Sequence, residues 1–205
     1  MRIGIKITIT IILLIGIILL FWLKWDTIIG KKTLPILPIN SQTVQDIPLI
    51  HIPNLYNQND IRWSNDLLGD TNERLGNVGC LVSSAAMNLS YYNIDINPKV
   101  LNKKLKKLDG YTHSGWLIWK KLEELTEDKI KIKFPKLSHE SIDRFLLKKI
   151  PVLAKILIDK RIPHWVLIVG KKDGEYLIYD PLKSDALKNI SVYDSLIYSI
   201  RTVTM

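Results

Sequence analysis

The order in which two kinds of pattern follow one another along the chain most constrains its fold. Residues 80–149 carry helical patterns, and after Ile150 come short runs rich in Val, Ile and Tyr that are broken by turn residues. A group of helices followed by a group of strands is typical of an α+β fold with an antiparallel sheet. The sequence therefore predicts an α+β domain in which a helical part precedes an antiparallel sheet.

Four helices and four strands are expected within this domain. The second helix should begin at Pro98 behind the cap Asn97, and Ser114 and Ser138 precede the third and the fourth. The expected helices are residues 80–92, 98–108, 115–125 and 139–149. The expected strands are PVLAKILI, HWVLIVG, EYLIYDP and SLIYSIRTVTM.

The amino-terminal segment has the composition of a membrane anchor. Residues 7–23 are apolar apart from two threonines, and this is close to the minimum of roughly 17 residues that a helix needs to span a bilayer. Trp22 and Trp25 lie where an interfacial aromatic belt would be. A cleaved signal peptide is the alternative, but no small-x-small cleavage site follows Leu23. We expect one retained transmembrane helix, with the domain outside the cytoplasm.

The rest of the chain divides into a linker and a domain. Residues 33–54 contain four prolines and no helical period, so they are expected to form an extended spacer. The expected parts are the anchor and its flank (1–32), the linker (33–54) and the domain (55–205). The formal net charge is +9, but the lysines lie mostly in helical segments such as KVLNKKLKKL, without an arginine-rich stripe. This pattern indicates a solvated surface and no nucleic-acid partner.

The stretch GNVGCLVSSAAMNLSYYN, residues 76–93, contains the only cysteine of the chain. A single cysteine excludes an internal disulfide and a multi-cysteine zinc site, so Cys80 is either a small buried residue or a reactive group. It lies where a helix would begin, and a helix amino terminus stabilises a thiolate. Gly76 and Gly79 would let the backbone turn sharply and leave room for a substrate.

A cysteine nucleophile needs an imidazole as its base and a third group to orient that imidazole. His164 opens one expected strand, and Asp180 ends the next. If the two strands form a hairpin centred on Lys172, His164 and Asp180 lie opposite each other on one face. A two-residue turn at Asp173-Gly174 would instead place Leu167 opposite Asp180.

Several segments in this order resemble the C39-like group of papain-fold cysteine peptidases. They are YNQNDIRW, GNVGCLVSSAAMNL, NPKVLNKKLKK, GYTHSGWLIWKKL, IPVLAKIL, HWVLIVG and YLIYDPL. The resemblance implies a papain-like fold in which Cys80 is the nucleophile, His164 the base and Asp180 the orienting residue.

The resemblance also implies an oxyanion-binding glutamine upstream of the cysteine, and Gln58 is the candidate. It lies farther from Cys80 than is usual in papain-like enzymes, so the intervening loop must fold back. Leu81 stands where many relatives carry a small residue. The bacteriocin-processing members are attached to ABC transporters, but this chain has no GxxxxGK motif and no such domain.

The sequence thus predicts a membrane-anchored cysteine peptidase that hydrolyses a peptide or protein substrate without cofactor or metal. His113 is a weak metal candidate, because no second ligand stands at a suitable spacing. Two alternatives stay open. One is a cell-wall amidase or acyl transferase on the same fold, and the other is a catalytically inactive module that binds peptide or glycan.

Overall fold

The computed structural model describes residues 36–39, 45–183 and 186–205. The expected transmembrane helix in residues 1–32 lies outside this part of the chain. Within the described ranges, no helix combines the length and the apolar character that crossing a bilayer requires.

Three of the four expected helices begin at the expected residue. The side chain of Asn97 accepts a hydrogen bond from the amide of Val100 at 3.0 Å. The hydroxyl of Ser138 likewise accepts one from the amide of Ser141 at 3.1 Å, so both predicted caps are confirmed. The helices are α2 (Leu75–Val78), α3 (Cys80–Tyr91), α4 (Pro98–Lys107), α5 (Trp119–Leu125) and α6 (His139–Leu147).

The start of the third expected helix is wrong, because α5 begins at Trp119 and not at residue 115. Tyr111 and Leu117 form an isolated antiparallel bridge, which closes the residues between them into a loop. Gly115 has a φ of 78° in this loop, a left-handed conformation that a helix cannot contain. Ser114 therefore belongs to the loop and caps no helix.

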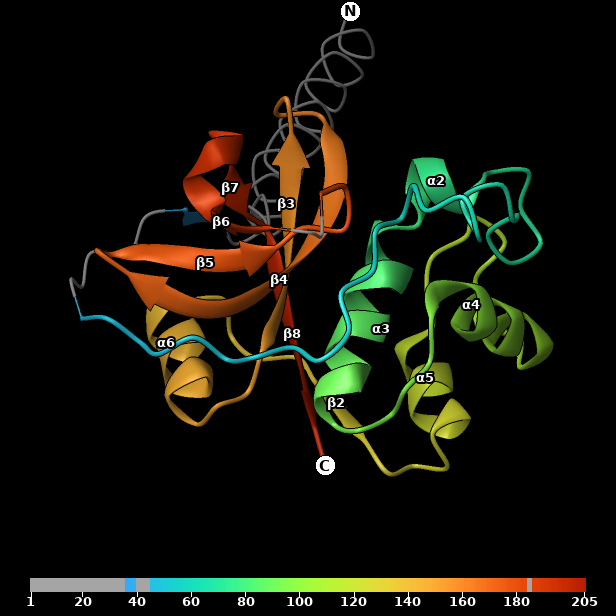
Figure 1. Cartoon of the computed structure of the whole chain (residues 1–205), viewed down its shortest axis with the longest axis horizontal. Helices are drawn as coiled ribbons and strands as arrows, with labels where there is room; N and C mark the ends of the chain where they lie inside the picture. The colour runs from blue at the N-terminus through green and yellow to red at the C-terminus, as the bar shows by residue number, and fades with distance from the viewer. Residues whose placement is uncertain (1–35, 40–44, 184–185) are drawn as a thin grey trace, which may run out of the picture. The chain divides into compact units, whose positions relative to one another are not determined.

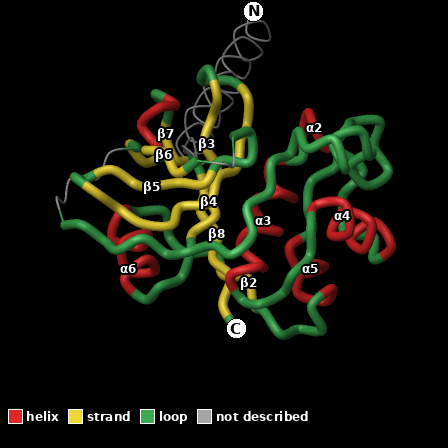
Figure 2. The backbone as a smooth tube through the Cα atoms, viewed as in Figure 1, coloured by secondary structure: helices red, strands yellow, loops and turns green. Residues whose placement is uncertain are grey.

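The expected antiparallel sheet is confirmed (Figure 2). Its order is β2-β8-β3-β4-β5-β6, and β1 and β7 form a separate two-stranded sheet. The strand β2 was not predicted, since it has only three residues and its pairing with β8 joins distant segments. The strands are β1 (Leu37–Pro38), β2 (Lys131–Lys133), β3 (Val152–Ile158), β4 (Ile162–Lys172), β5 (Glu175–Tyr179), β6 (Leu187–Asn189), β7 (Leu196–Ile197) and β8 (Ser199–Thr204), with a 3₁₀ turn η1 (Ile190–Tyr193) after β6.

Helix α3 lies between the sheet and the other helices of the amino-terminal half. It contacts β4 on one side and α4 on the other (Figure 1). Every residue of α3 from Val82 to Ser90 is buried, and these residues are mostly small or apolar. A helix that is buried all round belongs to the core, so its first residue, Cys80, is held in a rigid setting.

Residues 45–54, which were expected to lie in an extended spacer, pack against the hairpin of β4 and β5. Ile47 exchanges two backbone hydrogen bonds with Lys171, and the amide of Ile50 donates to the carbonyl of Val169 at 2.7 Å. Ile47, Ile50 and Ile52 are buried. This segment, which we call the edge segment, covers the part of β4 that β3 does not reach.

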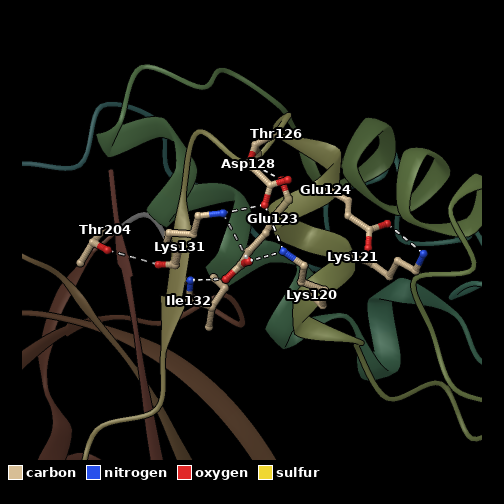
Figure 3. A network of polar contacts seen from close by, with 9 residues as sticks. All are labelled: Lys120, Lys121, Glu123, Glu124, Thr126, Asp128, Lys131, Ile132 and Thr204. Atoms are coloured by element: carbon tan, nitrogen blue, oxygen red, sulfur yellow. Dashed lines mark hydrogen bonds and ion pairs between the residues drawn. The ribbon is translucent and has the colours of Figure 1, made fainter.

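A network of charged side chains fastens the edge strand β2 to α5 (Figure 3). The carboxylate of Glu123 accepts hydrogen bonds from the amide of Ile132 at 2.7 Å and from the ammonium of Lys120 at 2.9 Å. These bonds lower the pKa of Glu123, the amide of Ile132 having the larger effect. The network fixes the position of β2 although the strand is short.

Candidate active site

Cys80 is the first residue of α3, as the sequence predicted. The glycines before it serve a different purpose from the expected one, since neither has a positive φ. A Cβ on Gly79 would lie 2.4 Å from the carbonyl oxygen of Leu75, and one on Gly76 would lie 3.1 Å from the side chain of Ser64. Glycine is thus needed because the backbone packs closely around the start of α3.

The thiol of Cys80 borders a cavity of about 460 Å³. Cys80 is 8% exposed. The walls of the cavity are mainly apolar, and its apolar lining includes Leu81, Trp116, Leu117, Ile162, Trp165 and Leu182. Trp116 and Ile162 are more than half exposed, at 56% and 57%, so apolar side chains extend from the cavity onto the surface. Such a cavity is suited to a bulky apolar group next to the thiol.

His164 also lines this cavity, and it joins Cys80 to Asp180. Its Nε2 lies 2.8 Å from Oδ1 of Asp180, and both side chains are buried. The imidazole also lies close enough to the side chain of Cys80 for that side chain to raise the pKa of His164. Since Asp180 occupies Nε2, Nδ1 is the nitrogen left to face the thiol. The three side chains predicted from the sequence are therefore brought together.

The hairpin that carries His164 and Asp180 does not have the register that placed them opposite each other. Lys172 pairs with Glu175, so Asp173 and Gly174 form a two-residue turn and the register centred on Lys172 is wrong. The ladder then shifts by one residue between Ile168 and Gly170, which is a β-bulge.

The bulge brings His164 and Asp180 onto the same face of the sheet. Without it, the two-residue turn would place Leu167 opposite Asp180, on the other face from His164. With it, Leu167 pairs with Tyr179, so Asp180 follows on the same face as Val166 and His164. The one-residue bulge thus brings His164 and Asp180 onto one face, which the register centred on Lys172 had been expected to do.

Three groups besides His164 hold the carboxylate of Asp180, and none of them was predicted from the sequence. The hydroxyl of Tyr193 donates a hydrogen bond to Oδ2, and the amide of Leu182 donates to Oδ1 at 2.9 Å. The ammonium of Lys188 lies 3.7 Å from Oδ2. Tyr193 and Lys188 come from a segment that pairs with β5 only in the folded sheet, so no local signal pointed to them.

These contacts shift the pKa values of the pair in opposite directions. Burial disfavours the charged form of both groups. For His164 the hydrogen bonds with Asp180 and Cys80 outweigh burial and raise its pKa to about 9. For Asp180 the hydrogen bonds from His164, Tyr193 and the amide of Leu182 outweigh burial and lower its pKa to about 2. At neutral pH the pair is therefore an imidazolium beside a carboxylate.

Gln58 lines the same cavity as Cys80, so the intervening loop does fold back. The amide of Gly76 donates a hydrogen bond to the carbonyl of Ser64 at 2.9 Å, which closes this loop. The Nε2 group of Gln58 donates to the carbonyl of Gly76 at 2.7 Å. An amide nitrogen carries two hydrogens, so this bond uses only one of them.

His113 lies apart from this site. It lines a different and smaller cavity with Asp70 and Lys106. Throughout residues 36–39, 45–183 and 186–205, no three His, Cys, Asp or Glu side chains are grouped so that they could hold a metal ion.

Comparison with known proteins places the site within a family. The model of the Peptidase C39 family matches residues 75–196, a span that contains Cys80, His164 and Asp180 but not Gln58. Among solved structures, a C39-like protein from Bacillus anthracis is 17% identical, with a TM-score of 0.47; the match covers 78% of this chain and 98% of that one. The search of curated proteins gave no match.

Proposed function

Because the chain belongs to the Peptidase C39 family, we propose that it hydrolyses a peptide bond through Cys80, His164 and Asp180. By family it is a cysteine peptidase. The observation that supports these roles is the position of the imidazole, which lines one cavity with the thiol and bonds to a buried carboxylate behind it.

The first half of the reaction would transfer the acyl group to the enzyme. The imidazolium of His164 already holds the proton given up by the thiol, so the sulfur of Cys80 attacks the carbonyl carbon of the substrate as a thiolate. The backbone amide of Cys80 is one of the first four of α3, which have no acceptor within the helix. This amide and the free hydrogen of Gln58 Nε2 would bind the oxyanion.

His164 then gives its proton to the leaving amine, and the carbon–nitrogen bond breaks. Water hydrolyses the thioester with His164 as the base, which returns the thiol. Asp180 holds the ring through Nε2 in both halves, so that Nδ1 stays directed at the sulfur. The apolar walls around Cys80 favour a substrate with a bulky apolar side chain beside the scissile bond.

We also propose that the apolar residues 7–23 hold the enzyme at a membrane with the domain outside the cytoplasm. The support is the length of the apolar run and the tryptophans at its end.

Alkylation of the thiol tests the Cys–His pair without a known substrate. Cys80 is the only cysteine, so the mass shift with iodoacetamide reports on this site alone. At pH 7 the parent should react at least about tenfold faster than His164→Ala, because His164 generates the thiolate. His113→Ala, the control, should react like the parent. Equal rates in the parent and in His164→Ala would refute the pairing.

Hydrolysis itself is tested with a proteome-derived peptide library and detection of new termini by mass spectrometry. The parent should release free new amino termini, Cys80→Ser should release none, and His164→Ala should be slower by about 10²–10⁴-fold. New carboxyl ends joined to another amine, instead of free carboxylates, would indicate an acyl transferase. A reactive thiol without any cleavage would favour the inactive binding module.

A further inference from the structure

A surface of cations and exposed aromatic rings lies next to the catalytic cavity. It consists of Lys155, Arg201, Trp116 and Phe134, which we call the aromatic–cationic ledge. Trp116 and Phe134 are 56% and 61% exposed, so two large rings face solvent. Trp116 also lines the cavity that contains the thiol. The ledge is therefore continuous with the proposed active site.

The sheet register places the two cations side by side. Lys155 pairs with Trp165 on β4 and with Ser199 on β8. Arg201 lies two residues beyond Ser199, so it is on the same face as Lys155 and diagonal to it, roughly 7–8 Å away between backbones. Trp165 lines the cavity, so Lys155 is one strand away from the cavity wall.

The aromatic rings hold both cations in place. The ammonium of Lys155 lies 5.3 Å from the ring centre of Trp116. The guanidinium of Arg201 lies 4.4 Å from that of Phe134 and 5.8 Å from that of Trp119. Such contacts orient the cations. The Nη1 of Arg201 also donates to Ser199 Oγ at 2.8 Å and to the carbonyl of Ile200 at 2.6 Å. Its Nη2 and the ammonium of Lys155 are therefore the groups left to meet an anion.

Neither cation has an ion-pair partner within the described ranges of the chain. Both side chains are half-buried, and burial lowers the pKa of Arg201. The Nε of Arg201 is buried and has no hydrogen-bond partner among the described residues. A half-buried cation that has lost hydration is stabilised when an anion binds it, so the ledge is electrostatically complementary to a carboxylate.

We infer that the aromatic–cationic ledge binds an acidic residue of the peptide substrate, close to the scissile bond. The inference rests on the proposed function, because it concerns the same substrate. An extended chain advances about 3.3–3.6 Å per residue. Lys155 lies 5.3 Å from the ring of Trp116, a distance that about two extended residues span, and Trp116 lines the cavity of Cys80, so the acidic residue lies on the substrate chain near the bond that Cys80 attacks.

The test uses short peptides of Ala and Leu in which one position is Glu, Gln or Lys, scanned on both sides of the Leu. Binding is measured by fluorescence anisotropy with the Cys80→Ala chain, and hydrolysis is measured with the parent. A Glu peptide should bind about tenfold more tightly than its Gln counterpart, and the Lys peptide more weakly than either. Lys155→Gln and Arg201→Gln should each remove most of this preference and leave affinity for the Gln peptide within about twofold.

Lys148→Gln is the matched control, since it removes the same charge from an exposed site at the end of α6. It should leave the preference for Glu intact. An equal loss in Lys148→Gln would show a general charge effect and overturn the inference, as would equal binding of Glu and Gln peptides. If Arg201→Gln unfolds, as seen by circular dichroism, Lys155→Gln decides alone.

The two proposals can fail separately. Preferential binding of the Glu peptide by Cys80→Ala, with no hydrolysis by the parent, would support the ledge and refute the peptidase. Hydrolysis of Glu and Gln peptides at equal kcat/KM would support the peptidase and refute the ledge.

Discussion

At the scale of single residues, the carboxylate of Asp180 depends on a side chain that the sequence did not single out. The hydroxyl of Tyr193 donates to Oδ2, and its ring centre lies 5.8 Å from that of His164. Tyr193 therefore contacts Asp180 directly and flanks the imidazole. We regard it as a positioning residue, because it acts on the reaction only through these two groups.

Replacing Tyr193 with Phe should lower kcat about tenfold or more and leave KM unchanged. A hydrogen bond to a charged group contributes about 1.5–3 kcal/mol, and its loss frees the carboxylate to turn away from His164. Steady-state kinetics on a cleaved library peptide measure both constants. Tyr198→Phe removes a hydroxyl from the same carboxyl-terminal segment and should have no effect. A rise in KM with an unchanged kcat would contradict the positioning role.

The raised pKa of His164 predicts the alkaline limit of activity. Protonated His164 is needed to give a proton to the leaving amine, and that form is lost as the pH rises through about 9. The kcat/KM of the parent should therefore fall near this pH. Asp180→Asn removes the negative charge that favours the imidazolium, so its alkaline limb should move to lower pH. Asp173→Asn, on the same hairpin, is the control, and an unmoved limb in Asp180→Asn would refute the assignment.

At the scale of elements, the β-bulge between Ile168 and Gly170 decides whether the site can form. A regular two-residue hairpin would have directed His164 and Asp180 to opposite faces. The bulge lies beside the edge segment, where the carbonyl of Val169 accepts the amide of Ile50. A Cβ on Gly170 would lie 3.2 Å from Leu49 Cα, so this glycine allows the edge segment to approach.

The edge segment should therefore contribute to the stability of the domain. Ile50 is 5% exposed and its neighbour Leu49 is 48% exposed. Ile50→Ala should lower the free energy of unfolding by about 2–5 kcal/mol, whereas Leu49→Ala should lower it by about 1 kcal/mol or less. Urea unfolding followed by tryptophan fluorescence compares the two variants. Equal losses of stability in Ile50→Ala and Leu49→Ala would mean that the edge segment acts as a spacer and does not stabilise the domain.

At the scale of the whole molecule, the proposed membrane attachment is separable from the fold of the domain. Replacing Ile12 and Ile15 with Lys adds about 2.5–3.5 kcal/mol per residue to the insertion of the apolar run. In alkaline carbonate extraction this variant should appear in the supernatant, whereas the parent should stay in the membrane pellet. As a control, Ile36 and Leu49, two exposed positions outside the apolar run, are replaced with Lys. This variant should stay in the membrane pellet like the parent. Release of the parent would refute the anchor.

The sequence by itself determined the local and ordered features of this protein. The caps Asn97 and Ser138, the start of α3 at Cys80 and the succession of helices and strands all depend on neighbouring residues. It also indicated Cys80, His164 and Asp180, because each marks the start or end of an expected element.

Only the tertiary structure decided which distant groups meet. The bulge between Ile168 and Gly170 depends on how the strands pack, and a period of two residues carries no signal for a one-residue shift. Tyr193 reaches Asp180 because the segment after β5 returns along that strand. Contacts of this kind are set by the closure of the whole sheet, so no window of the sequence contains them.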